Sequence, residues 1–77
     1  MASVRVKDQT GEETFFRVML WTRMSKVFKA YAQRKEVNES SLRFLLDGER
    51  MACDETPLSL RLRDQDQIDC LLEQRGD

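Results

Sequence analysis

A single stretch of this chain has the spacing of an amphipathic helix. Its apolar residues fall at positions i, i+3, i+4 and i+7, so they share one face of a helix predicted over residues 23–35, with Thr22 or Ser25 available as the N-cap. One helix buries an apolar face only against another element, so strands must supply the rest of the core. The residues of this stripe are Met24, Val27, Phe28 and Tyr31.

Two strand patterns precede the helix and predict a β-hairpin. Residues 2–6 alternate, residues 14–20 are rich in aromatic and branched side chains, and residues 8–11 (Asp-Gln-Thr-Gly) form the loop between them. Strict alternation would bury only half of the apolar side chains around the second strand, so some of them approach the surface. The candidates for exposure are Phe15, Met19, Leu20 and Trp21.

Further strand patterns follow the helix. Residues 42–46 alternate, which turns Phe44 inward and Leu45 outward. Two strands, a helix and three more strands predict an α+β fold in one domain spanning 1–77, with the helix across one face of a mixed sheet, which is the β-grasp pattern. The other predicted elements are a tight turn at Asp47-Gly48, a short strand at 50–51, and a final strand at 67–73 in which Ile68, Cys70 and Leu72 share one face.

The charge balance points to proteins as partners. Thirteen basic and fourteen acidic residues give a net charge of −1 over 77 residues, which removes the positive field typical of proteins that bind nucleic acid or anionic membranes. The N-terminus has no apolar signal segment, and no stretch approaches the roughly 18 apolar residues of a membrane span. We therefore expect a location in the nucleus and cytoplasm.

No pattern in the chain supports catalysis, a metal site or a cofactor. Histidine is absent, which removes the usual general base, and there is no glycine-rich phosphate loop. Cys53 and Cys70 are too few and too far apart for a disulfide scaffold, and neither lies at a predicted helix N-terminus that would lower its thiol pKa. We expect two reduced thiols in a protein that is not an enzyme.

Four segments give the chain a specific resemblance. They are Thr22 to Arg34 (with Lys29-Ala30-Tyr31 followed by Gln33-Arg34), Ser41 to Gly48 (Ser-Leu-Arg-Phe-Leu-Leu-Asp-Gly), Thr56-Pro57, and Asp66 to Asp69. Together they resemble the small ubiquitin-like modifier (SUMO) family, over almost the whole chain from Ala2 to Gly76. The resemblance implies a ubiquitin-like β-grasp roll, and residues 7–13 further resemble plant members, among which are tandem, di-SUMO-like proteins.

The resemblance implies a groove between the second strand and the helix, where a short apolar peptide flanked by acidic residues adds as an extra strand. Its partners would be proteins that carry SUMO-interacting motifs. The pattern alone leaves open that the apolar members fill the core while the basic ones form a solvated face. Carried over by position, the groove residues are Phe16, Arg17, Val18, Thr22, Lys26, Val27, Tyr31 and Arg34.

The chain departs from the family pattern at two places. Residues 19–21 (Met-Leu-Trp) stand where basic or polar residues are usual, and they either change the peptide preference of the groove, contact another domain or copy, or fold over the start of the helix. Arg61 and Arg63 stand where acidic residues are usual, so they weaken an implied contact with the SUMO conjugating enzyme or belong to a solvated charge run. That contact would consist of Gly48, Arg61, Arg63 and Asp66.

The last residues decide whether the domain can be attached to a target. Residues 74–77 are expected to form a flexible tail that ends in Gly76-Asp77, where the resemblance calls for Gly-Gly. Two residues without Cβ can thread a narrow catalytic channel, and Asp77 removes that property. We therefore expect a non-covalent interaction domain, alone or as one half of a tandem protein. The alternative is a covalent modifier, a partner of the SUMO conjugating enzyme and SUMO protease, whose Gly-Gly tail is altered or truncated in this chain.

Overall fold

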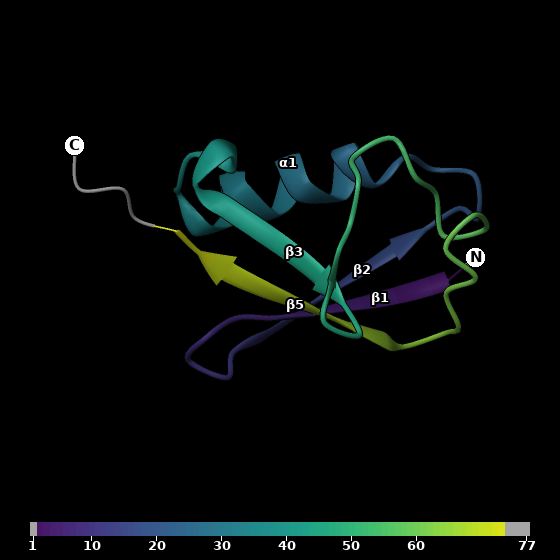
Figure 1. The fold of residues 1–77 in the computed structure, drawn as a ribbon, viewed down its shortest axis with the longest axis horizontal. Coiled ribbons are helices and arrows are strands. Elements are labelled where there is room, and N and C mark those ends of the chain that lie inside the picture. Colours follow the sequence, from purple (N-terminus) through teal and green to yellow (C-terminus); the bar gives the residue numbers. More distant parts are fainter. Residues whose placement is uncertain (1, 74–77) are drawn as a thin grey trace.

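A computed structural model describes residues 2–73 and shows one helix lying across one face of a five-stranded sheet (Figure 1). The strand order in the sheet is β2-β1-β5-β3-β4; β1 and β5 run parallel, and the other neighbours are antiparallel. This mixed sheet with one crossing helix confirms the predicted α+β architecture. The elements are β1 (Ala2–Lys7), β2 (Glu13–Val18), α1 (Met24–Lys35), a 3-10 helix η1 (Glu39–Ser41), β3 (Leu42–Leu46), β4 (Glu49–Arg50) and β5 (Asp66–Leu72).

The β1–β2 hairpin is closed by Asp8. Its carboxylate accepts hydrogen bonds from the backbone N–H of Thr10 at 2.9 Å, from the N–H of Glu12 at 3.0 Å and from the Thr10 hydroxyl at 2.6 Å. An aspartate that bonds the backbone two residues ahead is typical of an Asx turn. Gly11 has φ +91°, a conformation that glycine adopts without steric cost, so the loop returns the chain into β2.

The second strand is shorter than predicted. It ends at Val18 rather than at residue 20, because the chain turns there: the N–H of Thr22 donates to the carbonyl of Met19 at 3.1 Å. The carbonyl of Leu20 accepts instead from the N–H of Leu58 at 2.9 Å. Residues 19–21 therefore form a turn that is bonded to a distant loop, and they do not extend the sheet.

The helix begins at Met24 with Arg23 at the N-cap, so the prediction of Thr22 or Ser25 as the cap was wrong. Arg23 makes no side-chain capping bond. The N–H of Met24 donates to the carbonyl of Glu55 at 2.8 Å, and the N–H of Ser25 donates to that of Cys53 at 2.9 Å. Backbone carbonyls from a remote loop thus satisfy the donors that a side-chain cap would otherwise satisfy.

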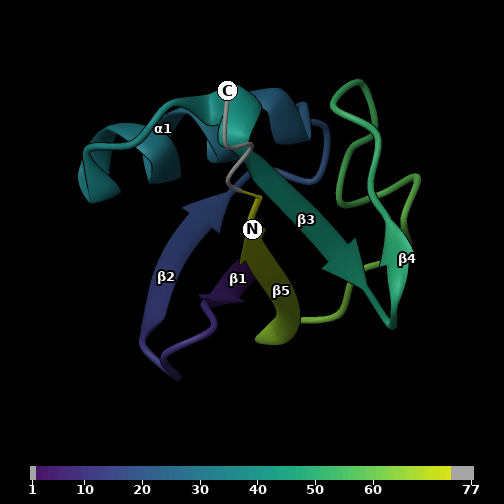
Figure 2. The same ribbon diagram turned by 60° about the vertical axis from the view of Figure 1, so that its left-hand side comes forward.

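The core lies between the helix stripe and the inward face of the sheet. Figure 2 shows α1 lying over that face. The ring of Phe28 stacks on that of Phe44 with 4.0 Å between centroids, and Tyr31 meets Phe44 edge-on at 5.8 Å. The predicted inward direction of Phe44 is confirmed, since it is buried, whereas Leu45 is half-buried. Core residues contributed by the strands include Val4, Val6, Leu42, Phe44, Ile68 and Cys70.

Two details of the later strands differ from the prediction. The short strand is Glu49–Arg50 rather than 50–51. Met51 follows it, is buried, and donates its N–H to the carbonyl of Phe44 at 2.9 Å, which continues the register of Leu45 with Arg50 for one more bond. Leu72 shares the inward phase of Ile68 and Cys70 but is 40% exposed. It lies at the last position of β5, at the end of the sheet, where it pairs with the first residue of β3.

The stacked pair predicts where the domain is most sensitive to truncation. Phe28→Ala or Phe44→Ala should each lower the free energy of unfolding by about 3–5 kcal/mol, because each removes a buried ring from a stack that cannot collapse. Leu45→Ala, at a half-buried position of the same strand, should cost less than half as much. Urea titrations followed by circular dichroism measure all three, and equal losses would show that the inward face of β3 has been assigned wrongly.

Candidate functional site

The second strand forms one edge of the sheet. It pairs only with β1 in the described structure, through a register that sets Val4 opposite Phe16 and Ala2 opposite Val18. Its other side therefore has backbone N–H and C=O groups without a strand partner along six residues. Such an edge is a template on which another extended chain can pair.

Phe16 and Val18 form an apolar wall on the helix side of this edge, where the sequence predicts the groove, and we keep the word groove for this place between β2 and α1. Both are half-buried and pack against the core, whereas Phe15 and Arg17, on the other face of the strand, are exposed. The ring of Phe16 meets that of Tyr31 at a centroid distance of 6.4 Å and an angle of 62°. The residues predicted to line the groove on this side are thus brought together through the alternation of β2.

Val27 and Tyr31 lie beneath the groove rather than on its surface. Their exposed fractions are only 3% and 1%, so both belong to the core. A ligand in the groove would meet Phe16 and Val18 directly, and these two buried residues hold the wall in place. Burial thus divides the predicted residues: Val27 and Tyr31 fill the core, while Phe16 and Val18 are only half-buried.

The four polar residues predicted for the groove do not all lie on its side of β2; they are Arg17, Thr22, Lys26 and Arg34. The guanidinium carbon of Arg34 lies 5.7 Å from the centre of the Phe16 ring, a cation–π contact that brings positive charge to the apolar wall. Arg17 is exposed on the opposite face of β2, and Lys26 is exposed on the helix with no hydrogen bond or ion pair to β2 within residues 2–73. Thr22 belongs to the turn after β2.

Tyr31 and its neighbour Cys70 are uncharged at neutral pH. Burial, followed by the nearby thiol of Cys70, raises the pKa of Tyr31 to about 12. Burial also raises the pKa of Cys70 to about 11, so this thiol is protonated at neutral pH and is a poor nucleophile. Both side chains are therefore uncharged packing groups of the core, Tyr31 next to Phe16 and Cys70 on β5.

A charged cluster joins the hairpin loop to the end of the helix. The ammonium of Lys35 pairs with the carboxylate of Asp8 at 3.3 Å and also with that of Glu12, and it lies 5.7 Å from the centre of the Tyr31 ring. The hydrogen bond from Thr10 is the largest cause that holds the pKa of Asp8 down, at about 2 rather than 3.8. Hydrogen bonding to Glu12 raises the pKa of Lys35.

The residues predicted to contact the conjugating enzyme fall at one end of the sheet. Because β5 runs antiparallel to β3, with Leu45 opposite Asp69, the turn holding Gly48 and the start of β5 at Asp66 lie toward the same end. Asp66 accepts a hydrogen bond from the backbone N–H of Arg63 at 2.8 Å. Arg61 and Arg63 are exposed, so the local positive charge inferred from the sequence is accessible.

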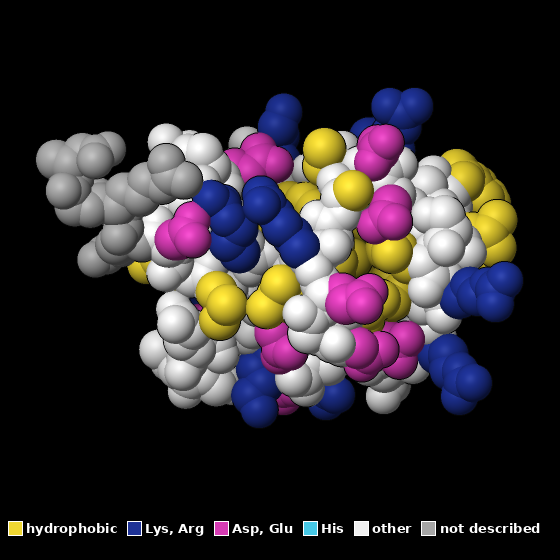
Figure 3. Space-filling model, viewed as in Figure 1, with side chains coloured by type: hydrophobic (Ala, Val, Ile, Leu, Met, Phe, Trp, Pro, Cys, Tyr) yellow, Lys and Arg dark blue, Asp and Glu magenta, His cyan; other side chains and the backbone are white. Residues whose placement is uncertain are grey.

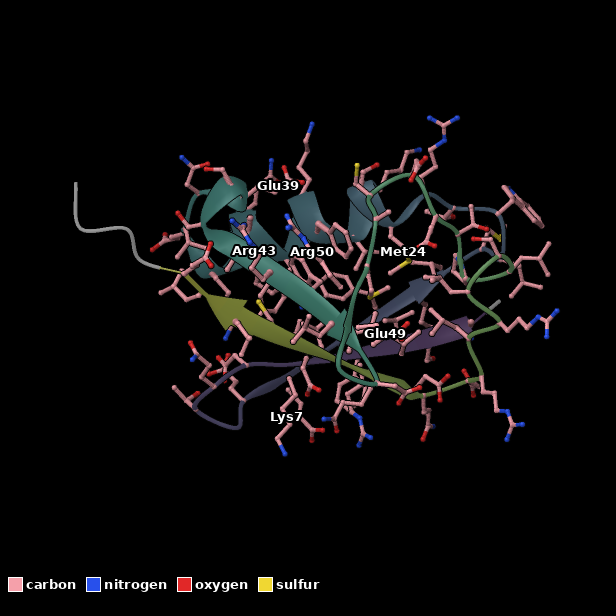
Figure 4. The ribbon with its side chains drawn as sticks, in the orientation of Figure 1. Lys7, Met24, Glu39, Arg43, Glu49 and Arg50 are labelled. Atoms are coloured by element: carbon pink, nitrogen blue, oxygen red, sulfur yellow. The ribbon has the colours of Figure 1, made fainter. Side chains whose placement is uncertain are left out.

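The structure contains a hollow that the sequence did not reveal. It has a volume of about 750 Å³ and lies on the other side of the sheet order from β2, where β3, β4 and the segment after them approach the helix. Its floor includes Phe28, Phe44 and Met51, and Glu39, Arg43 and Arg50 stand around it (Figure 4). The residues are far apart in the chain, so no local pattern marks them.

The structure also places Cys53 beside the helix N-terminus, through the carbonyl that accepts from Ser25. The sequence did not predict that Cys53 lies next to the helix, because the two segments meet only in the folded structure. Cys53 is exposed, and no disulfide joins the two cysteines of the described chain. Within residues 2–73 there is also no cluster of side chains suited to a metal ion, and no helix there has the length and apolar character to cross a bilayer.

The predicted tail residues Gly76 and Asp77 lie outside the described residues. The expectations that depend on them therefore rest on the sequence alone.

The fold is that of a ubiquitin-like β-grasp protein. The solved structure of Caldiarchaeum subterraneum ubiquitin superposes with a TM-score of 0.89, covering 99% of this chain and 98% of that chain, at 17% sequence identity. At that identity the likeness concerns the fold.

Sequence relatives identify the family. The family model described as Ubiquitin-2 like Rad60 SUMO-like matches residues 2–72. Small ubiquitin-related modifier 2 of Arabidopsis thaliana is 40% identical over 96% of this chain and 72% of its own length, and the small ubiquitin-related modifier of Caenorhabditis elegans is 44% identical over 95% of this chain and 80% of its own length. The chain belongs to the SUMO-like family.

The charged cluster predicts how stability depends on pH. The folded-state pKa of Asp8 is below its ordinary value of 3.8, so its contribution is present above about pH 4 and is lost as the pH falls toward 2. Asp8→Ala should therefore be less stable than the unmodified protein at pH 7, and the difference should shrink by more than half by pH 2.5.

Denaturant midpoints at several pH values test this prediction. Asp54→Ala is the matched control, because Asp54 is exposed and makes no hydrogen bond or ion pair within residues 2–73. A difference for Asp8→Ala that stays constant from pH 7 to pH 2.5 would contradict the role assigned to the carboxylate.

Proposed function

We propose that this SUMO-like chain is a protein-interaction domain that binds short apolar peptides flanked by acidic residues. The peptide adds as a strand to the free edge of β2, and its apolar side chains contact Phe16 and Val18. The single observation that carries this proposal is a free six-residue edge next to a half-exposed apolar wall. Main-chain hydrogen bonds would give affinity, and the wall would select the side chains.

Charge at the groove supports the preference for acidic flanks. Arg34 lies over the ring of Phe16, and Lys26 is exposed on the helix that borders the groove, whereas Arg17 projects from the opposite face of the same strand. Positive groups around an apolar strip favour carboxylates on either side of a peptide core, and salt should weaken that attraction. The partners are proteins that contain such motifs, in the nucleus and cytoplasm, and the domain performs no chemistry on them.

A second candidate function is that of a covalent modifier. The observation that favours it is that the relatives from Arabidopsis thaliana and Caenorhabditis elegans are both named small ubiquitin-related modifiers. In this role the conjugating enzyme would contact the end of the sheet that holds Gly48 and Asp66. A related arrangement is a tandem protein in which this domain supplies the groove.

Peptide titration tests the groove. A peptide with three or four Val or Ile residues beside acidic ones should bind with roughly micromolar affinity, about −8 kcal/mol. Amide shifts in nuclear magnetic resonance spectra should appear first within residues 16–34. Arg34→Glu should weaken binding about tenfold, because it removes the cation beside the wall and adds a repulsive charge.

Arg50→Glu is the matched control for this titration, since it makes the same charge change at the opposite edge of the sheet, beside the hollow. It should change the affinity less than twofold. If Arg50→Glu weakens binding and Arg34→Glu does not, the peptide occupies the hollow. Shifts that cluster at residues 61–70 would also show that the groove is not the site.

A thioester assay with a SUMO activating enzyme tests how the residue at position 77 affects activation. We expect no ATP-dependent thioester from the chain that ends at Asp77, and at least partial charging of Asp77→Gly, which has the slim Gly-Gly end. Adding Arg61→Glu and Arg63→Glu should improve the following transfer to the conjugating enzyme, because both arginines oppose the charge expected there. Normal charging of the unmodified chain would favour the covalent function.

A further inference from the structure

Four exposed apolar side chains gather at one end of the molecule. We call Met19, Leu20, Trp21 and Leu58 the end patch; Trp21 is 70% exposed and Leu58 is 65% exposed. The two segments meet through the hydrogen bond from the N–H of Leu58 to the carbonyl of Leu20, at 2.9 Å. Figure 3 shows hydrophobic side chains at the right-hand end, where Figure 1 shows the turn after β2 beside the loop near residue 60.

The backbone beneath the end patch is firmly held. The N–H of Thr22 bonds to the carbonyl of Met19, and the N–H of Arg61 bonds to that of Leu58, both at 3.1 Å. Pro57, next to Leu58, is fully buried. The side chains of the end patch therefore project from an ordered platform, which reduces the entropy lost when a partner binds.

The rim of the end patch is basic. Arg17 lies two residues before Met19, Arg23 lies two residues after Trp21, and Arg61 is bonded through its backbone to Leu58. All three arginines are exposed, and none forms an ion pair within residues 2–73. An apolar centre with free cations around it is complementary to an apolar residue with acidic neighbours.

A second copy of this chain fits the end patch poorly. The exposed apolar area of four side chains is on the order of a few hundred Å², whereas a stable dimer buries about 800 Å² on each partner. A two-fold dimer would also set the same patch against itself, so that the arginines of one copy face those of the other. Size and charge both favour an acidic peptide segment.

We propose that the end patch anchors an apolar residue, flanked by acidic ones, in the same peptide whose core adds to β2. This inference rests on the proposed function, because β2 ends at Val18 and the end patch begins at the next residue. A chain that pairs along the free edge and continues past Val18 would reach the end of the strand where Met19 and Trp21 follow. The domain would thus recognise a longer motif: a strand-forming core and a separate apolar-acidic anchor.

Trp21 is the single tryptophan of the chain, so its fluorescence reports on this site alone. Three synthetic peptides without tryptophan or tyrosine are compared. The first has only the Val/Ile core with acidic residues; the others add a short acidic segment containing one Leu, either before or after the core. We expect one extended peptide to bind about tenfold tighter than the core peptide and to shift Trp21 emission to shorter wavelength.

Variants at the end patch separate this inference from the groove itself. In calorimetry, Trp21→Ser combined with Leu58→Ser should abolish the gain from the extension and leave the affinity of the core peptide unchanged within twofold. Both side chains are mostly exposed, so the fold should be kept. Phe15→Ser is the matched control: its ring is 57% exposed on the other face of β2, and the gain should persist.

Three results would overturn the inference. If the core peptide binds and neither extension improves its affinity, the end patch is not an anchor site, while the proposed groove stands. If no peptide binds, both fail. If sedimentation shows self-association of the free protein that Trp21→Ser removes, the occupant of the end patch is a second copy.

Discussion

The rest of this domain depends on the packing of one helix face against the inward face of the sheet. Phe28 stacks on Phe44, and Tyr31 meets both Phe44 and Phe16 edge-on, so a single aromatic cluster connects β3 through the helix with the edge strand β2. This cluster fixes the distance between α1 and β2. Because Tyr31 is buried and Phe16 only half-buried, the same contact that stabilises the core also presents an apolar wall to solvent.

Local patterns predicted the elements well, whereas long-range contacts decided their ends. The helix stripe and the alternation of β3 and β5 placed Phe28, Phe44 and Ile68 correctly, since burial follows the period of each element. The start of α1 could not be predicted from its own sequence, because its cap consists of carbonyls from the loop at 53–55. The end of β2 was likewise set by the bond from Leu58 to Leu20.

The candidate site was predictable to a similar extent. Alternation and family resemblance together named Phe16 and Val18, and the structure brings both to the helix side of the edge strand. Arg17 was named by position alone, and strand geometry turns it to the opposite face. Leu58 was missed, since nothing near it in the chain indicates that it lies beside Trp21. The hollow around Phe28 and Arg50 was missed for the same reason: its lining comes from segments that meet only in the fold.

The two edges of the sheet explain why a peptide should add at β2. The opposite edge is β4, which has only two residues, Glu49 and Arg50, both exposed and charged. A strand that short offers few backbone groups to a partner, and charged side chains on an edge discourage pairing. The edge of β2 is three times as long and has an apolar wall beside it, although Glu13 and Arg17 keep charge on its outer face. In the proposed function, the added chain would be apolar where it contacts the wall and acidic where it meets the nearby arginines. The same two requirements would apply at the end patch. Selectivity at the edge of β2 and at the end patch would therefore come from the same combination of apolar contact and opposite charge.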